Sequence, residues 1–505
     1  MTTLSPDSLG GVRTRGGGRP RPGILHLGLG SFHRAHQAVY TDTALEVAGG
    51  AWGIVGVASR SSRVVDAMRT QSLLYTVVEI SPEGSSFRVP RAHSDVFVGA
   101  LDRDRVRVEI ASAETRIVSL TVTENGYTYR PSTGRLDLSD PGVQHDLANP
   151  GAPRTVIGQL ARGLQLRART HASPVTILSC DNLAENGKHT EQLVREFVAA
   201  LPGSEERDLS PFLDSHVTFP SSMVDRIVPA TTDHYRTLVT DSLGYVDAVP
   251  VPAEPFTMWV MEDRFAAGRP QWESAGAVFS DEVAGYEQLK MRLLNGTHSL
   301  IAYLGALAGC PTIPDSVAKG FIEEAARTVL REEYLPSVTV PSGVDVSAYE
   351  AELFVRWSNS ALGHRTSQVG TDGSVKLRQR IPEPAIGLLS QGQMPHHLAL
   401  TVAAYLCCVA PLGGFDPGPD AALMQDAARP LLTSLAGTSS TGRQLAQRVL
   451  VEHHLLGETL TQFDDFIDRV GELVDILHAD GPRAAATDAA RRDVSPYSLE
   501  NGGTP

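Results

Sequence analysis

The chain has 505 residues, of which 42% are hydrophobic and 20% are charged, and its formal net charge is −14. This length is too great for one ordinary core, so we expect two domains. The excess of acidic side chains argues against nucleic-acid binding, which depends on clustered Lys and Arg. The four cysteines form no CxxC pair, which argues against both a disulfide framework and a zinc site.

Residues 1–22 are rich in Gly, Arg, Ser and Pro and contain no apolar stretch of the kind found in a signal peptide. We predict a disordered tail over 1–22. No segment of the sequence approaches the roughly 18 consecutive apolar residues of a membrane span. We therefore expect a cytoplasmic protein with no membrane partner.

Ordered structure is predicted from Gly23 onward. The apolar run at 24–28 is followed by a glycine turn, a helical pattern over 32–47 and a second apolar run at 52–58. Strand, turn, helix and strand within about 35 residues form a βαβ unit. Further strands are predicted at 73–78, 117–122 and 174–179, and helices at 156–169 and 190–200. This alternation predicts a doubly wound, largely parallel sheet with helices on both faces.

The apolar pattern becomes mostly helical after about residue 285. Helices are predicted at 288–307, 322–334, 398–409, 442–454 and 464–478. The predicted fold class is therefore α/β, with a Rossmann-type doubly wound domain over 23–284 and a mainly α-helical domain over 285–495.

Two glycines, Gly28 and Gly30, lie directly between the first predicted strand and its helix. This spacing lets the backbone approach a pyrophosphate, and a helix N-terminus favours the anion. The third glycine of the usual fingerprint is absent, and His33 stands in its place. An ordinary strand-to-helix turn would also explain the two glycines.

The end of the second predicted strand normally distinguishes NAD from NADP. A carboxylate there holds the ribose 2′-OH, whereas an arginine accommodates a 2′-phosphate. Here Ser59, Arg60 and two further serines follow the strand, and the first carboxylate is Asp66. The choice of dinucleotide stays open, because Arg60 fits NADP and equally fits a solvated surface position.

Lys290, Asn295 and His298 lie within one predicted helix. At 3.6 residues per turn they fall within about 140° of arc and line one side. A buried lysine with a lowered pKa acts as a base near neutral pH, and an amide stabilises a developing alkoxide. A solvated lysine and a structural histidine are the ordinary alternatives.

Residues 180–187 follow another predicted strand, where ligands of doubly wound sheets bind. Asn182 and Asn186 are placed to reach that crevice. Helix capping by Asp181 or Asn182 would explain the same residues without a ligand.

Taken together, these segments resemble the mannitol dehydrogenase family of polyol-specific long-chain dehydrogenases. The resemblance covers about 25–490, and the matching blocks occur in the family's order. They are Gly28–Gln37, Thr123–Tyr127, Cys180–Gly187, Phe219–Ile227 and Lys290–His298.

The resemblance implies a Rossmann-type domain, a helical domain and an active site between them. It makes Lys290 the acid/base, Asn186 and Asn295 the oxyanion hole, and His298 the residue that orients the substrate. Val224 and Asp225 become substrate-pocket positions. It implies NAD as the cofactor and no metal in catalysis. The expected cofactor-binding residues are Gly28, Gly30, Ser31, Phe32, His33, Arg60, Glu124, Asn125 and Asn182.

The segment 359–376 is similar to the family's substrate-binding loop, with His364, Arg365 and Lys376 as expected substrate ligands. Gln368 and Thr371 stand where mannitol 2-dehydrogenases often carry Arg and His, and the loop is closer to fructuronate reductases. Mannitol, arabinitol, a hexuronate and mannitol 1-phosphate all stay open as substrates. A dinucleotide-sensing module without turnover is the non-enzymatic alternative. The expected partner is a small sugar, and the expected state is a monomer or a small oligomer.

Overall fold

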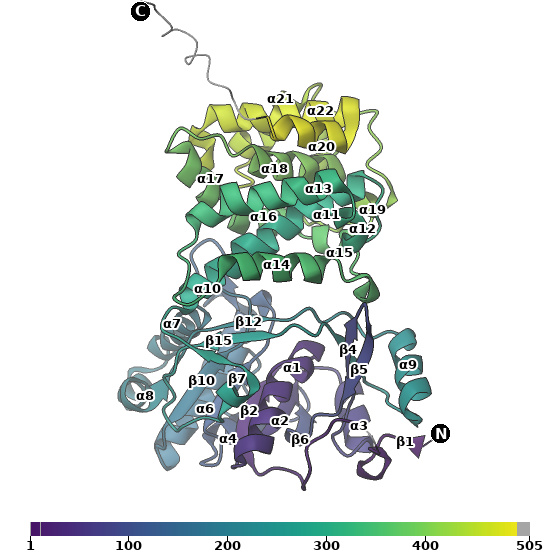
Figure 1. The fold of residues 1–505 in the computed structure, drawn as a ribbon. Coiled ribbons are helices and arrows are strands. Elements are labelled where there is room, and N and C mark those ends of the chain that lie inside the picture. Colours follow the sequence, from purple (N-terminus) through teal and green to yellow (C-terminus); the bar gives the residue numbers. More distant parts are fainter. Residues whose placement is uncertain (1, 11, 492–505) are drawn as a thin grey trace, which may run out of the picture. The chain divides into compact units, whose positions relative to one another are not determined.

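The computed structural model describes residues 2–10 and 12–491. The chain divides into two compact units between Glu287 and Gln288, close to the expected boundary at 284/285. Unit 1 contains the sheets and unit 2 is built from helices (Figure 1). Each unit is described by itself.

The centre of unit 1 is a six-stranded sheet in which every neighbouring pair is parallel. In spatial order its strands are β11 (Val217–Thr218), β10 (Val175–Ser179), β7 (Ile117–Leu120), β2 (Pro22–Leu27), β3 (Gly53–Ala58) and β6 (His93–Val98). The chain starts at β2 in the middle, runs outward through β3 and β6, and then returns to β7 on the other side of β2. The strand order therefore reverses between β2 and β7, which is the switch point at which doubly wound sheets bind ligands.

Both faces of this sheet are buried, because alternate residues of each strand point to opposite faces. One face packs on α4 (Arg103–Ala111), α6 (Val156–Thr170) and α7 (Asn186–Ala199). The other face packs on α2 (Gln37–Ala48) and on Trp259 and Trp272 (Figure 1). Leu25 and Leu27 of β2 belong to the first core, and Ile24 belongs to the second.

The predicted strand at 73–78 is placed too early, since the structure forms β4 at Val77–Ser81. Leu73 instead lies in a turn with a positive φ of 69°. The predicted helix over 32–47 is two helices, α1 (Ser31–Ala35) and α2, because the backbone leaves helical geometry at His36. The smaller strands of unit 1 are β5 (Gly84–Arg88), β8 (Tyr129–Arg130), β9 (Arg135–Leu136), β12 (Ser222–Asp225), β13 (Tyr245–Val246), β14 (Val251–Ala253), β15 (Met258–Met261) and β16 (Val278–Phe279). Its other helices are α3 (Arg63–Thr70), η2 (Glu124–Tyr127), α5 (Pro141–Ala148), α8 (Gly203–His216), α9 (Asp233–Leu243) and η3 (Trp272–Ala275).

The described residues of the N-terminal segment, predicted as a disordered tail over 1–22, include regular secondary structure. Strand β1 (Thr2–Thr3) pairs with β13, and helix η1 (Pro6–Ser8) follows it. The side chain of Leu4 is fully buried. Leu4 and Leu9 are both buried, and strand pairing with β13 adds to this packing, which composition alone does not reveal.

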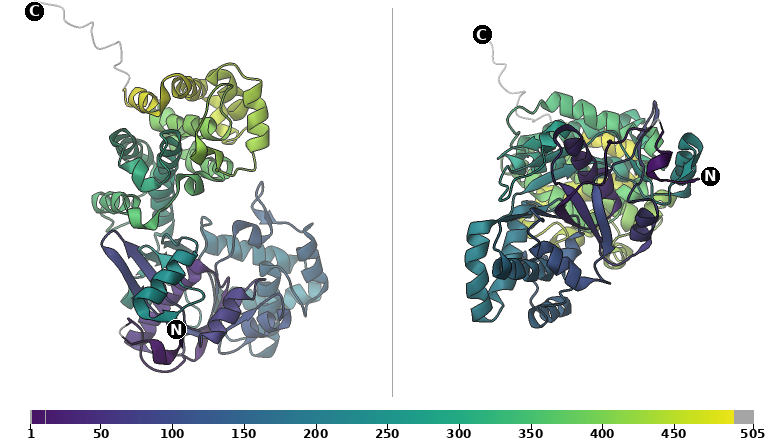
Figure 2. Two further views of the ribbon diagram at one scale, coloured as in Figure 1. Left: turned by 90° about the vertical axis from the view of Figure 1, so that its right-hand side faces the viewer. Right: turned by 90° about the horizontal axis from the view of Figure 1, so that it is seen from below.

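From Gln288 to Arg491 every described element of unit 2 is helical, as the green and yellow ribbons in Figure 2 show. Helices α11 (Thr297–Leu307) and α18 (His396–Val409) are buried on nearly all sides and form its centre. The other helices of at least eight residues are α13 (Gly320–Thr328), α14 (Val346–Trp357), α16 (Gly373–Arg380), α17 (Pro382–Leu389), α20 (Arg429–Gly437) and α22 (Asp464–Ala489), which bends at Gly481. The shorter segments include α12 (Ile313–Val317), α15 (Thr366–Gly370), α19 (Pro419–Ala422) and α21 (Gly442–Ala446), and α10 (Val283–Leu289) spans the boundary.

Three helical segments of unit 2 are π-helical: η4 (Lys290–Gly296), η5 (Val329–Tyr334) and η8 (Gln447–Glu452). Segment η4 contacts η5, and a Cβ on Gly296 would lie 2.4 Å from the Tyr334 ring. The wider π turn thus lets the backbone of η4 approach an aromatic ring that any larger residue would displace. Single π turns of this kind occur frequently at functional sites.

We predict that Leu4→Ala lowers the free energy of unfolding by about 2 kcal/mol, because it removes a fully buried side chain from its packing. Denaturant titration of the full chain measures this loss. Leu101→Ala is the matched control, since Leu101 is 79% exposed and should change stability little. Equal stability of the two variants would show that the N-terminal segment does not pack on unit 1.

Candidate functional site

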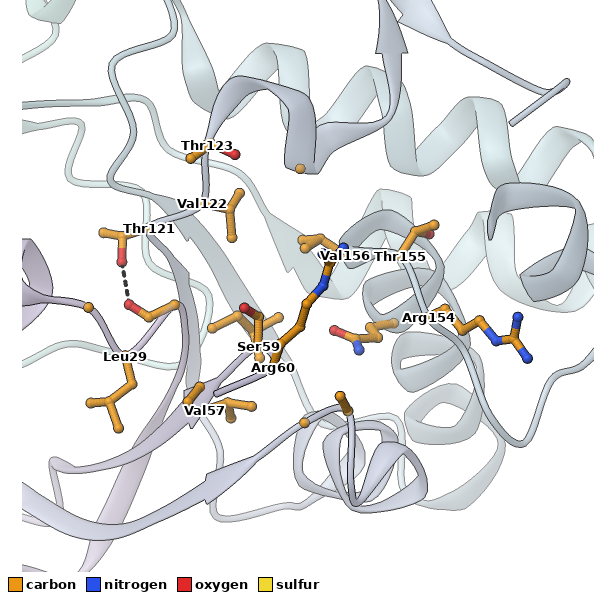
Figure 3. A pocket seen from close by; sticks show the side chains of 18 of the residues that line it. Leu29, Val57, Ser59, Arg60, Thr121, Val122, Thr123, Arg154, Thr155 and Val156 are labelled. Atoms are coloured by element: carbon orange, nitrogen blue, oxygen red, sulfur yellow. Dashed lines mark hydrogen bonds between the residues drawn. The ribbon is translucent and has the colours of Figure 1, made fainter. Parts of the chain in front are cut away.

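Unit 1 contains a pocket of about 910 Å³ at the carboxyl ends of its parallel strands (Figure 3). Its walls come from the turn after β2, the residues after β3, β6 and β7, and the start of α6. Its lining includes Gly28, Leu29, Gly30, Ser59, Arg60, Arg103, Thr121, Thr123, Gly126, Asp140 and Arg154. The pocket therefore lies where the strand order reverses, as expected for a doubly wound sheet.

The turn at Gly28 fits the close approach of a dinucleotide backbone. Gly28 has a φ of +116°, and a Cβ there would lie 2.0 Å from the Thr121 carbonyl oxygen, so only glycine is tolerated. At Gly30 the nearest atom to an added Cβ is 3.7 Å away, which leaves the backbone open towards the pocket. The glycine spacing and the position of the pocket at the carboxyl ends of the strands together fit a nicotinamide dinucleotide.

A buried polar network holds this turn from the sheet side. His26 contacts the Gly28 carbonyl oxygen at 3.1 Å and the Thr121 hydroxyl at 2.8 Å through Nε2, and Ser119 at 2.9 Å through Nδ1. The Thr121 hydroxyl donates to the same Gly28 carbonyl. Burial lowers the pKa of His26 to about 3, so the ring is neutral at physiological pH.

His33, expected as a cofactor-binding residue, lies in this buried network and is not among the residues that line the pocket. Its ring stacks on that of His26 at 3.5 Å, and its Nδ1 donates to Gln37 Oε1. Because Nδ1 carries the hydrogen, Nε2 of His33 accepts from His93 at 3.1 Å. The imidazole occupies the position of the third glycine by turning inward.

The other expected cofactor residues are not all gathered at the pocket. Gly28, Gly30 and Arg60 line it, whereas Ser31, Phe32 and Asn182 do not. The side chains of Glu124 and Asn125 lie outside the described part of the structure. Their neighbours Thr123 and Gly126 do line the pocket. Arg103 and Arg154 were not expected at the pocket, because neither lies in the segment that directly follows β3. Arg103 comes after β6, and Arg154 comes just before α6.

Asp181 positions the loop that follows β7. Its carboxylate accepts from the Val122 amide at 2.8 Å and from the Tyr127 hydroxyl at 2.5 Å. Burial raises the pKa of Asp181 to about 7 and raises that of Tyr127 well above its usual value. From the sequence, Asp181 was expected only as a helix cap. In the structure its hydrogen bonds connect the end of β10 to the loop after β7.

Asn186 is fully buried at the start of α7. Its amide donates to the Asp181 and Ser222 carbonyls at 2.9 and 2.7 Å, and its oxygen accepts from the Ser222 amide. Both donor hydrogens are therefore in use in this geometry. A role for Asn186 in an oxyanion hole requires one of these bonds to be exchanged for a substrate oxygen.

In unit 2, Lys290 and Asn295 lie at positions one and six of the π-helical segment η4, where α-helical spacing was assumed. Hydrogen bonding from residue i to i+5 brings this pair closer to one face than an α-helix would. Both side chains are half-buried. The Asn295 amide contacts only the Met291 sulfur at 3.8 Å, a weak acceptor, and so keeps its donor capacity.

His298 is buried in α11, and its Nε2 atom has no hydrogen-bond partner in the described part of unit 2. Its ring lies 5.3 Å from that of His364 and 6.1 Å from that of Trp357. Burial lowers the pKa of His298 well below its usual value, and His364, Arg380, Arg356 and Lys376 lower it further. A neutral imidazole with an open nitrogen is suited to bind a hydroxyl group.

Positive charge gathers around His298. Lys376 has its pKa lowered to about 8 by burial and by Arg380, and its ammonium donates to the Val369 and Thr371 carbonyls. Arg380, one turn further along α16, donates to the Asn295 carbonyl and to Ser299. The i, i+4 spacing of Lys376 and Arg380 places both cations on one face of α16, and this spacing is visible in the sequence.

The remaining expected substrate residues differ in their surroundings. His364 lies beside His298, and burial lowers its pKa to about 4. Arg365 is half-exposed and pairs with Asp420 at 3.2 Å. In unit 1, Val224 and Asp225 are buried on β12, and Val224 packs in the core with Leu178.

Among residues 2–10 and 12–491, no group of three or more His, Cys, Asp or Glu side chains is arranged to hold a metal ion. Within the same residues, no helix is long and apolar enough to cross a membrane.

Comparison with known families matches residues 22–274 to the mannitol dehydrogenase Rossmann domain and residues 282–477 to the mannitol dehydrogenase C-terminal domain. The chain belongs to the mannitol dehydrogenase family. Members of this family are oxidoreductases, and the two matched domains correspond to the parallel-sheet unit and the helical unit described above.

Relatives within the mannitol dehydrogenase family carry different substrates in their names. D-mannonate oxidoreductase of Escherichia coli is 40% identical, and the match covers 76% of this chain and 79% of the relative. Mannitol 2-dehydrogenase of Cereibacter sphaeroides is 36% identical, and the match covers 81% of this chain and 86% of the relative. The structure of Pseudomonas fluorescens mannitol 2-dehydrogenase with NAD and D-mannitol is 31% identical, with a TM-score of 0.84 over 96% of this chain and 99% of that one.

We predict that Asp181 makes folding pH-dependent near neutrality. Because the pKa of Asp181 is raised from 3.8 to about 7, the folded chain keeps this proton when the unfolded chain has lost it. The free energy of unfolding should therefore fall as the pH rises from about 4 to about 7. Asp181→Asn should flatten this fall in denaturant titrations at several pH values.

The matched control is Asp241→Asn, an exposed carboxylate on α9, which should keep the wild-type pH profile. A wild-type profile in Asp181→Asn as well would show that Asp181 is ionised in the folded protein throughout this range.

Proposed function

We propose that this chain is an NAD-dependent oxidoreductase that interconverts an aldonate and its ketouronate, of the D-mannonate and fructuronate type, without a catalytic metal. A neutral sugar alcohol and its ketose, of the mannitol and fructose type, form the second candidate pair. The observation that favours the acid is the cluster of positive side chains around His298.

The charge balance of this cluster supports an anionic substrate. Lys376, Arg380 and Arg356 all lower the pKa of His298, so positive potential exceeds negative at its ring. Two carboxylates, Asp372 and Asp426, raise the pKa of Lys376, and Asp426 also accepts hydrogen bonds from Ser374 and Tyr405. Lys376 is the stronger candidate for a substrate carboxylate, because Arg365 is paired with Asp420.

The relatives support the same choice of reaction. The D-mannonate oxidoreductase of Escherichia coli carries a sugar acid in its name, at 40% identity. The structure that contains NAD and D-mannitol supports NAD as the cofactor and keeps a neutral polyol as the alternative.

The roles of the side chains follow from their chemistry. The bound nicotinamide supplies the hydride acceptor for alcohol oxidation and the hydride donor for ketone reduction. Lys290 takes the hydroxyl proton during oxidation and returns it during reduction. Asn295 donates its amide hydrogen to the developing alkoxide, and His298 orients a hydroxyl through Nε2.

Asn186 is proposed as the second oxyanion donor, in exchange for one of its two backbone bonds. Val224 and Asp225 are proposed as pocket positions, and His364 and Lys376 as ligands of the substrate's acidic end. Mannitol 1-phosphate would satisfy the same cations through its phosphate, so a sugar phosphate must be included in the tests. A dinucleotide sensor without turnover would retain binding of NADH alone.

Lys290→Ala should lower kcat at least ~100-fold, the usual contribution of a positioned general base, while NADH binding is retained. Added primary amine should restore part of the rate if the missing group is the proton acceptor. Lys319→Ala, an exposed lysine of unit 2, is the matched control. An unchanged kcat in Lys290→Ala would remove this residue from proton transfer.

Lys376→Gln should lower kcat/KM for fructuronate by about tenfold or more and change that for fructose less, because only the acid uses the ammonium charge. The ratio of the two values, measured with NADH, separates charge recognition from a general loss of activity. Arg378→Gln is the control, since Arg378 is exposed on the same helix. An equal loss for both sugars would contradict the proposed carboxylate contact.

A further inference from the structure

We infer that the end of the dinucleotide pocket beyond β3 is a phosphate-binding subsite, and that this chain binds NADP(H) as well as NAD(H) through the 2′-phosphate. The inference rests on the proposed use of a nicotinamide dinucleotide. It concerns Ser59, Arg60, Ser61, Arg103 and Arg154, which all line the pocket.

The charges of the pocket wall are unbalanced. Arg60, Arg103 and Arg154 line it, and none of their guanidinium groups forms an ion pair in the described part of unit 1. Among the described lining residues Asp140 is the one acidic residue, and its carboxylate caps α5 by accepting from the Gly142 and Val143 amides. Unpaired arginines in a chain with a net charge of −14 provide a local attraction for an anion.

The position of these residues identifies which part of the ligand they meet. In a doubly wound sheet, the residues after the second strand reach the adenosine ribose. Ser59, Arg60 and Ser61 directly follow β3, and they supply two hydroxyl groups and one guanidinium. The pyrophosphate instead belongs to the turn at Gly28, so these residues are available for a second phosphate.

Figure 3 shows Arg60 extending from the end of β3 across the pocket towards Val156, whereas the Arg154 side chain extends away from Arg60. Arg60 is therefore the cation that reaches across the pocket, while Arg154 lines the pocket from the segment before α6. An arginine presents a planar fork of donors that matches phosphate oxygens.

Among the described residues that directly follow β3, none carries the carboxylate that would favour NAD alone. The first acidic residue after β3 is Asp66, which lies in α3 and does not line the pocket. Without a carboxylate there, no like charge opposes a 2′-phosphate, and NAD loses one strong hydrogen bond to its ribose. This combination removes the usual discrimination against NADP(H).

The test measures the affinity of the protein for NADH and for NADPH. Cofactor fluorescence reports the binding, at low and at high salt. We expect NADPH to bind within about tenfold of NADH, and its affinity to fall more steeply with salt. Adenosine 2′,5′-bisphosphate should displace either cofactor better than AMP does. Both fragments lack the nicotinamide half, so the difference between their affinities reports the contact with the 2′-phosphate.

Arg60→Ala and Arg60→Glu test the assigned residue. Each should weaken NADPH at least about tenfold, with the larger loss in Arg60→Glu, while NADH changes less than about twofold. Arg154→Ala should weaken NADPH in the same direction. Arg19→Ala, an exposed arginine of unit 1 outside the pocket lining, is the matched control. Circular dichroism verifies that each variant is folded.

The outcomes separate this inference from the proposed function. NADH binding with NADPH more than about a hundredfold weaker would overturn the subsite and leave the oxidoreductase proposal intact. Equal losses of NADH and NADPH in Arg60→Glu would also overturn it, because they show no contact specific to the 2′-phosphate. Absence of binding by both cofactors would overturn the proposed function itself.

Discussion

The close approach of Gly28 to the Thr121 carbonyl is the constraint on which the rest of unit 1 depends. An added Cβ would lie 2.0 Å from that oxygen, so the turn after β2 can enter the pocket only as glycine. His26 fixes the turn from beneath through the Gly28 carbonyl and Thr121. A neutral buried ring suits this task, because it bonds to both strands without placing a charge in the sheet. The pocket is thereby shaped before any ligand binds.

Both units concentrate positive charge within a chain that is acidic overall. Unit 1 presents three arginines at its pocket, and unit 2 gathers Lys376 and Arg380 near His298. In unit 2, burial and the neighbouring Arg380 lower the pKa of Lys376, which is an unfavourable arrangement for the ammonium unless an anion is bound. Such a cost to the free protein is typical of sites built for a ligand. Net charge alone would have pointed away from anionic ligands.

The parallel sheet with covering helices, the helical character of the second half and the glycine turn were predictable from sequence, because they follow from apolar periodicity and from the special conformation of glycine. The order of the strands in the sheet was not predicted. Neither was side-chain direction. His33 was expected at the cofactor, whereas its ring contacts His26 and His93 in the buried network. The π-helical geometry at Lys290 was also hidden, because an apolar pattern does not reveal an i to i+5 bond. The N-terminal segment shows the same limit for composition, since its overall polarity does not reveal the burial of Leu4 and Leu9 or the pairing of β1 with β13.

The central claim is that unit 2 recognises an acidic sugar through the cations near His298. The most direct measurement is steady-state reduction of fructuronate and of fructose by NADH in the wild-type protein, followed by loss of NADH absorbance. We predict that kcat/KM for fructuronate exceeds that for fructose by at least about tenfold, and that the preference shrinks with added salt. An equal or higher kcat/KM for fructose would contradict the account and make the enzyme one for neutral sugar alcohols.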